Sequence, residues 1–135
     1  MLLLLLACGP KKATETAATA PIERVEASCD RPEGMFGPVL RDDALHSDAK
    51  RFSELSTTQE SPVEVCMVEG QLSALTSLTC DDGSNPFADM GQAHAARVGN
   101  TGPGGRCGSI IDVYEVPCPE ATYEVHMDMY VCPSS

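Results

Sequence analysis

The residues best suited to chemistry lie near the end of the chain, where a histidine stands between carboxylates. Residues 122–131 alternate between apolar and polar side chains, which predicts a strand with one buried and one wet face. Three polar side chains are expected together on the wet face: Glu124, His126 and Asp128. Asp112 or Tyr114 of the preceding strand could join them, depending on register. Such a histidine can ligate a metal ion or transfer protons, although an ordinary exposed strand face is the simpler interpretation.

Met127 and Met129 lie beside this histidine and offer soft sulfur donors, a combination that suits copper. Strand alternation places both methionines on the face opposite to His126. Methionine commonly fills gaps in a protein core, so we expect both side chains to be buried. The same core face is expected to hold Tyr123, Val125 and Val131.

A second segment rich in oxygen ligands follows Cys80. Its candidate ligands for a hard cation such as calcium are Asp81, Asp82, Ser84, Asn85 and Asp89. The calcium loop that is recognisable from sequence alternates its acidic residues, whereas Asp81 and Asp82 are adjacent. An Asp-Gly turn tied to Cys80 is therefore the favoured interpretation.

Catalytic signatures are missing from the sequence. The three histidines form no close pair of the zinc-hydrolase type, and no motif for a serine nucleophile occurs. The glycine-rich segment 99–108 lacks the spacing of a phosphate-binding loop and is expected to be a loop held by Cys107. We therefore expect no cofactor, no small-molecule substrate and no enzyme activity. A hydrolase that uses His126 or Asp112 is the least favoured alternative.

The cysteines indicate an oxidising compartment. Seven are present, and one of them, Cys8, lies close to the start. The other six permit three disulfides: Cys29, Cys66, Cys80, Cys107, Cys118 and Cys132. No Cys-x-x-Cys pair occurs, so a structural role is expected rather than a redox role. The pairing is open, but Cys107 and Cys132 flank the expected C-terminal hairpin at similar distances from its turn, which favours a bridge between them.

The first residues resemble the lipobox of bacterial lipoproteins. A run of leucines leads into Leu5-Leu6-Ala7-Cys8, with a small residue directly before the cysteine. In that family the cysteine thiol receives a diacylglyceryl group, and cleavage leaves the lipidated cysteine as the new N-terminus. The resemblance implies a signal peptide over 1–7 and lipidation of Cys8. No basic residue precedes the leucines and the run is short for a secretory signal, so we expect the true start to lie upstream.

The resemblance also implies an address in the cell envelope, with the chain facing the periplasm or the cell surface. Gly9 after the lipidated cysteine, in place of Asp, is similar to lipoproteins that are passed on to the outer membrane. Residues 8–28 carry almost no large apolar side chain, so they are expected to form a flexible tether behind the lipid. The apolar run itself is too short to span a membrane, which needs about 20 apolar residues.

The net charge of −11 restricts the partners. Nucleic acid is disfavoured because phosphate contacts need clustered Lys and Arg. Anionic lipid headgroups are also repelled, so membrane association is expected to depend on the lipid anchor.

Residues 29–135 are expected to form one disulfide-bonded domain. Its expected elements are a helix over 42–55, strands over 63–69 and 71–80 joined by a turn at Gly70, an ambiguous segment over 87–98, and a hairpin of strands 110–116 and 122–131. The expected fold class is therefore α+β, a small domain of mainly antiparallel strands with a C-terminal hairpin and one short helix, stapled by disulfides.

The expected function is that of a membrane-anchored envelope lipoprotein with a non-catalytic binding or structural domain. Its partner could be another envelope protein. The alternative is a metal-binding module for calcium, copper or zinc that uses some of five residues: His126, Asp112, Asp128, Asp81 and Asp82.

Overall fold

The structure, a computed structural model, describes residues 29–31 and 37–134. The expected signal peptide (1–7), the expected lipidation site Cys8 and the rest of the tether (to residue 28) lie outside the described residues. Within the described ranges, no helix is both long enough and apolar enough to cross a membrane.

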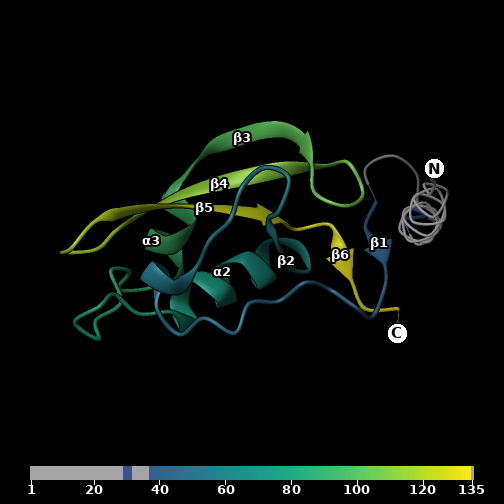
Figure 1. Cartoon of the computed structure of the whole chain (residues 1–135). Helices are drawn as coiled ribbons and strands as arrows, with labels where there is room; N and C mark the ends of the chain where they lie inside the picture. Colours follow the sequence, from purple (N-terminus) through teal and green to yellow (C-terminus); the bar gives the residue numbers. More distant parts are fainter. Residues whose placement is uncertain (1–28, 32–36, 135) are drawn as a thin grey trace, which may run out of the picture.

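A four-stranded sheet forms the frame of the domain (Figure 1). Its strands, in spatial order, are β2 (Val63–Glu64), β5 (Thr122–Asp128), β4 (Ser109–Pro117) and β3 (Arg97–Gly104). β4 is antiparallel to both of its neighbours, whereas β2 runs parallel to β5. The predicted C-terminal hairpin is confirmed, with Tyr114 of β4 opposite Val125 of β5.

Two helices, α2 (Met67–Ser77) and α3 (Met90–Ala95), lie against one face of this sheet (Figure 1). α3 begins at Asp89, whose carboxylate accepts a hydrogen bond of 2.9 Å from the backbone N–H of Gln92. A short 3-10 helix, η2 (Phe52–Glu54), adds Phe52 to the same core. The buried side chains between the layers include Phe52, Leu75, Leu78, Ala93, Tyr114, Val116, Val125 and Met127.

The main helix lies elsewhere than predicted. Residues 42–55 are irregular up to η2, and residues 71–80, expected as a strand, belong mostly to α2. The two buried residues of α2, Gln71 and Leu75, are four positions apart, which is helical spacing. Gly70 forms no turn. A Cβ at Gly70 would lie 3.0 Å from that of Val65, so the glycine allows α2 to approach the preceding chain closely.

The glycine-rich segment is also more regular than predicted. β3 continues to Gly104, with register shifts between Arg97 and Gly99 and between Asn100 and Pro103. Only residues 105–108 form the turn that leads into β4. The ambiguous segment 87–98 divides between α3 and the start of β3.

Three disulfides join all six cysteines of the domain. The pairs are Cys29–Cys107, Cys66–Cys132 and Cys80–Cys118. The predicted Cys107–Cys132 bridge is therefore wrong. The prediction fails because β6 (Val131–Cys132) leaves the four-stranded sheet and pairs in parallel with β1 (Val39–Leu40). This pairing brings Cys132 to Cys66 at the start of α2. The predicted fold class, a small disulfide-bonded α+β domain with mainly antiparallel strands, is confirmed.

Candidate functional site

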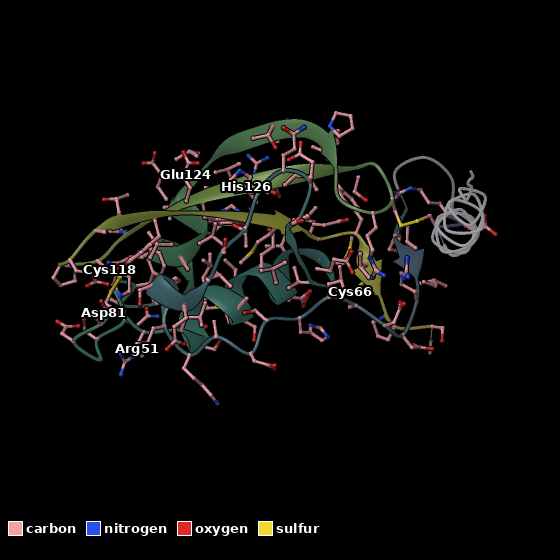
Figure 2. The ribbon with its side chains drawn as sticks, viewed as in Figure 1. Arg51, Cys66, Asp81, Cys118, Glu124 and His126 are labelled. Atoms are coloured by element: carbon pink, nitrogen blue, oxygen red, sulfur yellow. A yellow bond between two sulfur atoms is a disulfide. The ribbon has the colours of Figure 1, made fainter. Side chains whose placement is uncertain are left out.

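The structure separates the residues that were expected to share one wet face. The β4–β5 register turns Asp112 and Tyr114 toward the helices, away from His126. Figure 2 shows Glu124 and His126 on the outer side of the sheet. Asp128 is fully buried. The predicted cluster around His126 is therefore wrong at Asp112 and Asp128, because the strand alternation does not reveal which residues the neighbouring segments cover.

The Asp112 carboxylate belongs to a buried hydrogen-bonded network between α2 and the sheet. The amide Nε2 of Gln71 donates to its Oδ2 at 2.8 Å, and Arg97 Nη2 donates to its Oδ1 at 2.8 Å. The Tyr114 hydroxyl donates to Gln71 Oε1 at 2.7 Å. Burial, followed by the Asp112 carboxylate, raises the pKa of Tyr114, so this hydroxyl stays a neutral donor. Each polar group of the network is paired, which indicates a structural role.

The Asp81–Asp82 segment forms the predicted turn. The Cys80 N–H donates to Ser84 O at 2.7 Å, and Asp82 Oδ1 accepts from the Ser84 hydroxyl at 2.6 Å. These hydrogen bonds from Ser84 lower the pKa of Asp82. Asp81 Oδ1 accepts from the Ser53 hydroxyl. Asp82 is therefore bound within its own turn and Asp81 to the neighbouring η2, and Figure 2 shows Asp81 apart from His126.

Among the described residues, one group of three candidate metal ligands has its atoms within 4.8 Å of one another. It consists of Cys80, Cys118 and Glu120. The two cysteines are joined in a disulfide, so neither offers the thiolate that a metal ion requires. The ring of His126 instead lies beside Thr57, whose hydroxyl oxygen accepts from the His126 backbone N–H at 2.9 Å.

A row of three hollows lies along the segment 41–49, and His46 lines all three. Their volumes are about 130, 200 and 280 Å³. We call this row the His46 groove. Six of its apolar lining residues are Leu55, Val63, Val65, Ala74, Leu78 and Met127. No local sequence pattern indicates the groove, since it forms between segments that are distant along the chain.

The rim of the His46 groove is polar and carries charged side chains. Ser47 and Ser77 line the smallest hollow, and Arg41 and Asp42 line the largest. Hydrogen bonds from Ser134 lower the pKa of Asp42. The guanidinium of Arg41 holds the pKa of Asp43 far below its ordinary value. Both carboxylates are therefore ionised at neutral pH, and they add to the acidic charge of the whole chain.

Comparison of the chain with protein-family models, with curated proteins and with solved structures gives no match. Its function is therefore inferred from its residues and their geometry.

Proposed function

We propose that the chain is a lipid-anchored protein of the cell envelope whose disulfide-bonded domain binds a partner polypeptide without catalysis. The anchor is supported by the lipobox-like Leu5-Leu6-Ala7-Cys8 and by the pairing of the other six cysteines with one another. Binding without catalysis is supported by the burial of Asp112, which faces the helices, and of Asp128, which leaves neither carboxylate on the open face that carries His126. The single observation that carries the binding role is the His46 groove.

The size of the hollows favours an extended peptide over a compact ligand. Pockets for small molecules usually have volumes of about 300–1,000 Å³, and each hollow of the His46 groove is smaller. An extended strand presents alternate side chains to the same side, about 6–7 Å apart, so it can place one apolar side chain in each of several hollows.

The charge of the chain selects the partner. With a net charge of −11 on the whole chain and an ionised Asp42 in the largest hollow, the domain attracts a cationic segment. The occupant that we propose is an extended segment of another protein with small apolar side chains at alternate positions and lysine or arginine between them.

This binding role can be tested with Ala74→Leu, which fills the smallest hollow from α2. The probe is a labelled synthetic peptide that alternates valine and lysine, with a peptide that alternates valine and glutamate as its counterpart. We expect the wild-type domain to bind the lysine peptide, and Ala74→Leu to weaken that binding at least about tenfold, or about 1.4 kcal/mol. Fluorescence anisotropy measures both affinities.

Ala95→Leu is the matched control, because Ala95 is an exposed residue of α3 and lines none of the three hollows. Ser77→Leu provides a second filling variant at an exposed position, in case Ala74→Leu unfolds the domain. Equal binding of the two peptides, or equal affinity of the filled variants and the control, would show that the groove is not the binding surface. Concentration-dependent self-association that blocks the groove would instead identify a second copy as the occupant and contradict the proposal.

A further inference from the structure

Asp128, the last residue of β5, is a fully buried carboxyl group with one unused oxygen. Its side chain is 0% exposed. Oδ1 accepts a hydrogen bond of 2.9 Å from the Tyr130 N–H, whereas Oδ2 has no hydrogen-bond partner among the described residues. A buried carboxylate without a partner is costly, so the group either binds a cation or holds a proton.

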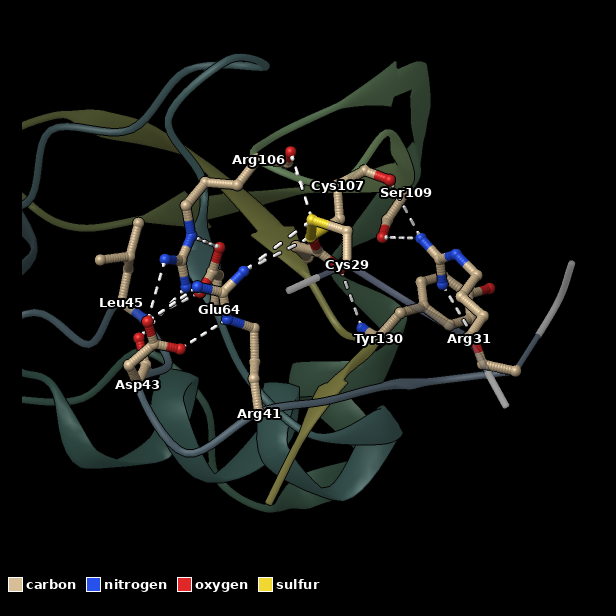
Figure 3. The surroundings of a disulfide bond; sticks show 12 residues. Cys29, Arg31, Arg41, Asp43, Leu45, Glu64, Arg106, Cys107, Ser109 and Tyr130 are labelled. Atoms are coloured by element: carbon tan, nitrogen blue, oxygen red, sulfur yellow. Dashed lines mark hydrogen bonds and ion pairs between the residues drawn. A yellow bond between two sulfur atoms is a disulfide. The ribbon is translucent and has the colours of Figure 1, made fainter. Parts of the chain in front are cut away.

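The neighbouring cations are already engaged. Glu64, the register partner of Asp128 on β2, is also buried and receives two hydrogen bonds from the Arg106 guanidinium, one of them 2.9 Å long from Nε. Arg31 donates to Ser109 Oγ at 2.7 Å and to two backbone carbonyls. Figure 3 shows both guanidinium groups with these partners. One of the two buried carboxyl groups is therefore neutralised by Arg106, and the other is not.

The turn 105–108 closes directly over the unused oxygen. A Cβ built on Gly105 would lie 3.4 Å from Asp128 Oδ2 and 3.3 Å from Pro62 Cγ, so the Gly105 backbone lies beside that oxygen and a larger side chain would be confined there. The Gly105 N–H cannot serve it, because that group donates to Gln59 O at 2.9 Å. The same turn carries Arg106, which binds Glu64, and Cys107, which is bonded to Cys29.

We propose that Asp128 is a proton-binding latch for the turn 105–108. With a proton on Oδ2 the turn lies closed on a neutral group. When that proton passes to bulk water, the new carboxylate is buried beside the Glu64 carboxylate, and the turn opens to admit water to it. Opening of the turn also loosens the attachment of Cys29 to the rest of the domain, because Cys29 is bonded to Cys107 of that turn.

The direction of the pKa shift agrees with this geometry. Burial raises the pKa of Asp128 and the Glu64 carboxylate adds to the rise, while the Tyr130 N–H, Ser109 and Arg31 oppose it. The folded domain therefore holds this proton more tightly than the unfolded chain does. Its contribution to stability is complete below the ordinary pKa of aspartate and is lost as the pH rises through the pKa of folded Asp128.

The test compares hydrogen exchange at the Gly105 and Arg106 amides in the wild-type chain and in Asp128→Asn. Asparagine keeps the shape and cannot ionise. We expect the ratio of wild-type to variant exchange rates to rise as the pH increases above the ordinary pKa of aspartate, by about tenfold for each unit by which the fold raises the pKa. Asp48→Asn, at an exposed position, is the matched control, and its ratio should stay constant.

A direct titration of the wild-type chain decides the question if Asp128→Asn does not fold. With carbon-13 in the aspartate carboxyl groups, NMR should show Asp128 ionising at higher pH than an ordinary aspartate. Ionisation of Asp128 at the ordinary pH, or a wild-type to variant ratio that does not change with pH, would overturn the proposal.

Discussion

Gln71 shows how one polar side chain can join a helix to a sheet. It stands on the face of α2 that packs against β4, and its amide uses its oxygen for Tyr114 and its nitrogen for Asp112. Both hydrogen bonds are buried, so breaking one would leave a polar group with neither a protein partner nor water. The network therefore stabilises the domain mainly because none of these polar groups is left unpaired.

Gln71→Leu should destabilise the domain by about 2–6 kcal/mol, because it leaves the Tyr114 hydroxyl and one oxygen of Asp112 unpaired at about 1–3 kcal/mol each. Denaturant unfolding measures this free energy. Ser73→Leu, at an exposed position of the same helix, should change it by less than about 0.5 kcal/mol. Equal stability of Gln71→Leu and the wild type would show that the network does not hold α2 on the sheet.

For single residues, the sequence shows which side chains could do chemistry but not which groups they contact in the folded domain. Asp112, Asp128 and His126 were recognised as candidates for chemistry, and each has a different neighbourhood in the structure. Asp112 meets Gln71, Asp128 is covered by Gly105, and His126 lies beside Thr57. Gln71 and Asp112 are 41 residues apart in the sequence, and Thr57 and His126 are 69 residues apart. No local pattern could therefore predict these contacts.

The helices and strands of the domain could be predicted where the apolar side chains of a segment follow a single repeat. The β4–β5 hairpin follows from strict alternation and a proline-containing turn. The partial alternation over 71–80 predicts a strand, whereas α2 forms there, in agreement with the helical spacing of Val68, Leu72 and Leu75. The expected helix over 42–55 does not form. Phe52 enters the core from η2, whereas Leu45 stays 47% exposed, so the thin apolar stripe did not mark one buried face.

The Cys80–Cys118 disulfide ties the turn after α2 to the turn of the hairpin. Replacing both cysteines by alanine should reduce the free energy of unfolding by about 4 kcal/mol, the chain-entropy value for a loop closed over a sequence separation of 38 residues. Urea unfolding of the double variant under non-reducing conditions checks this loss. An unchanged midpoint would mean that the hairpin and the Asp81–Asp82 turn hold together without the bond.

Over the whole molecule, the cysteines divide into two kinds. Six are joined within the domain, and Cys8 alone stands in the lipobox-like segment. The number of disulfides followed from this division, but their pairing did not, because β6 leaves the sheet and carries Cys132 to Cys66. The acidic charge makes attraction to anionic lipid weak, so attachment to a membrane would depend on Cys8.

The most direct test of this division is the intact mass of the protein extracted from membranes and alkylated without reduction. We predict a chain that begins at Cys8, carries the mass of a diacylglyceryl-type lipid and contains no alkylated thiol, and we predict that Cys8→Ala abolishes membrane recovery. A chain that keeps residues 1–7, an unmodified Cys8, or alkylation of any of the six domain cysteines would contradict the lipid-anchored, disulfide-bonded molecule proposed here.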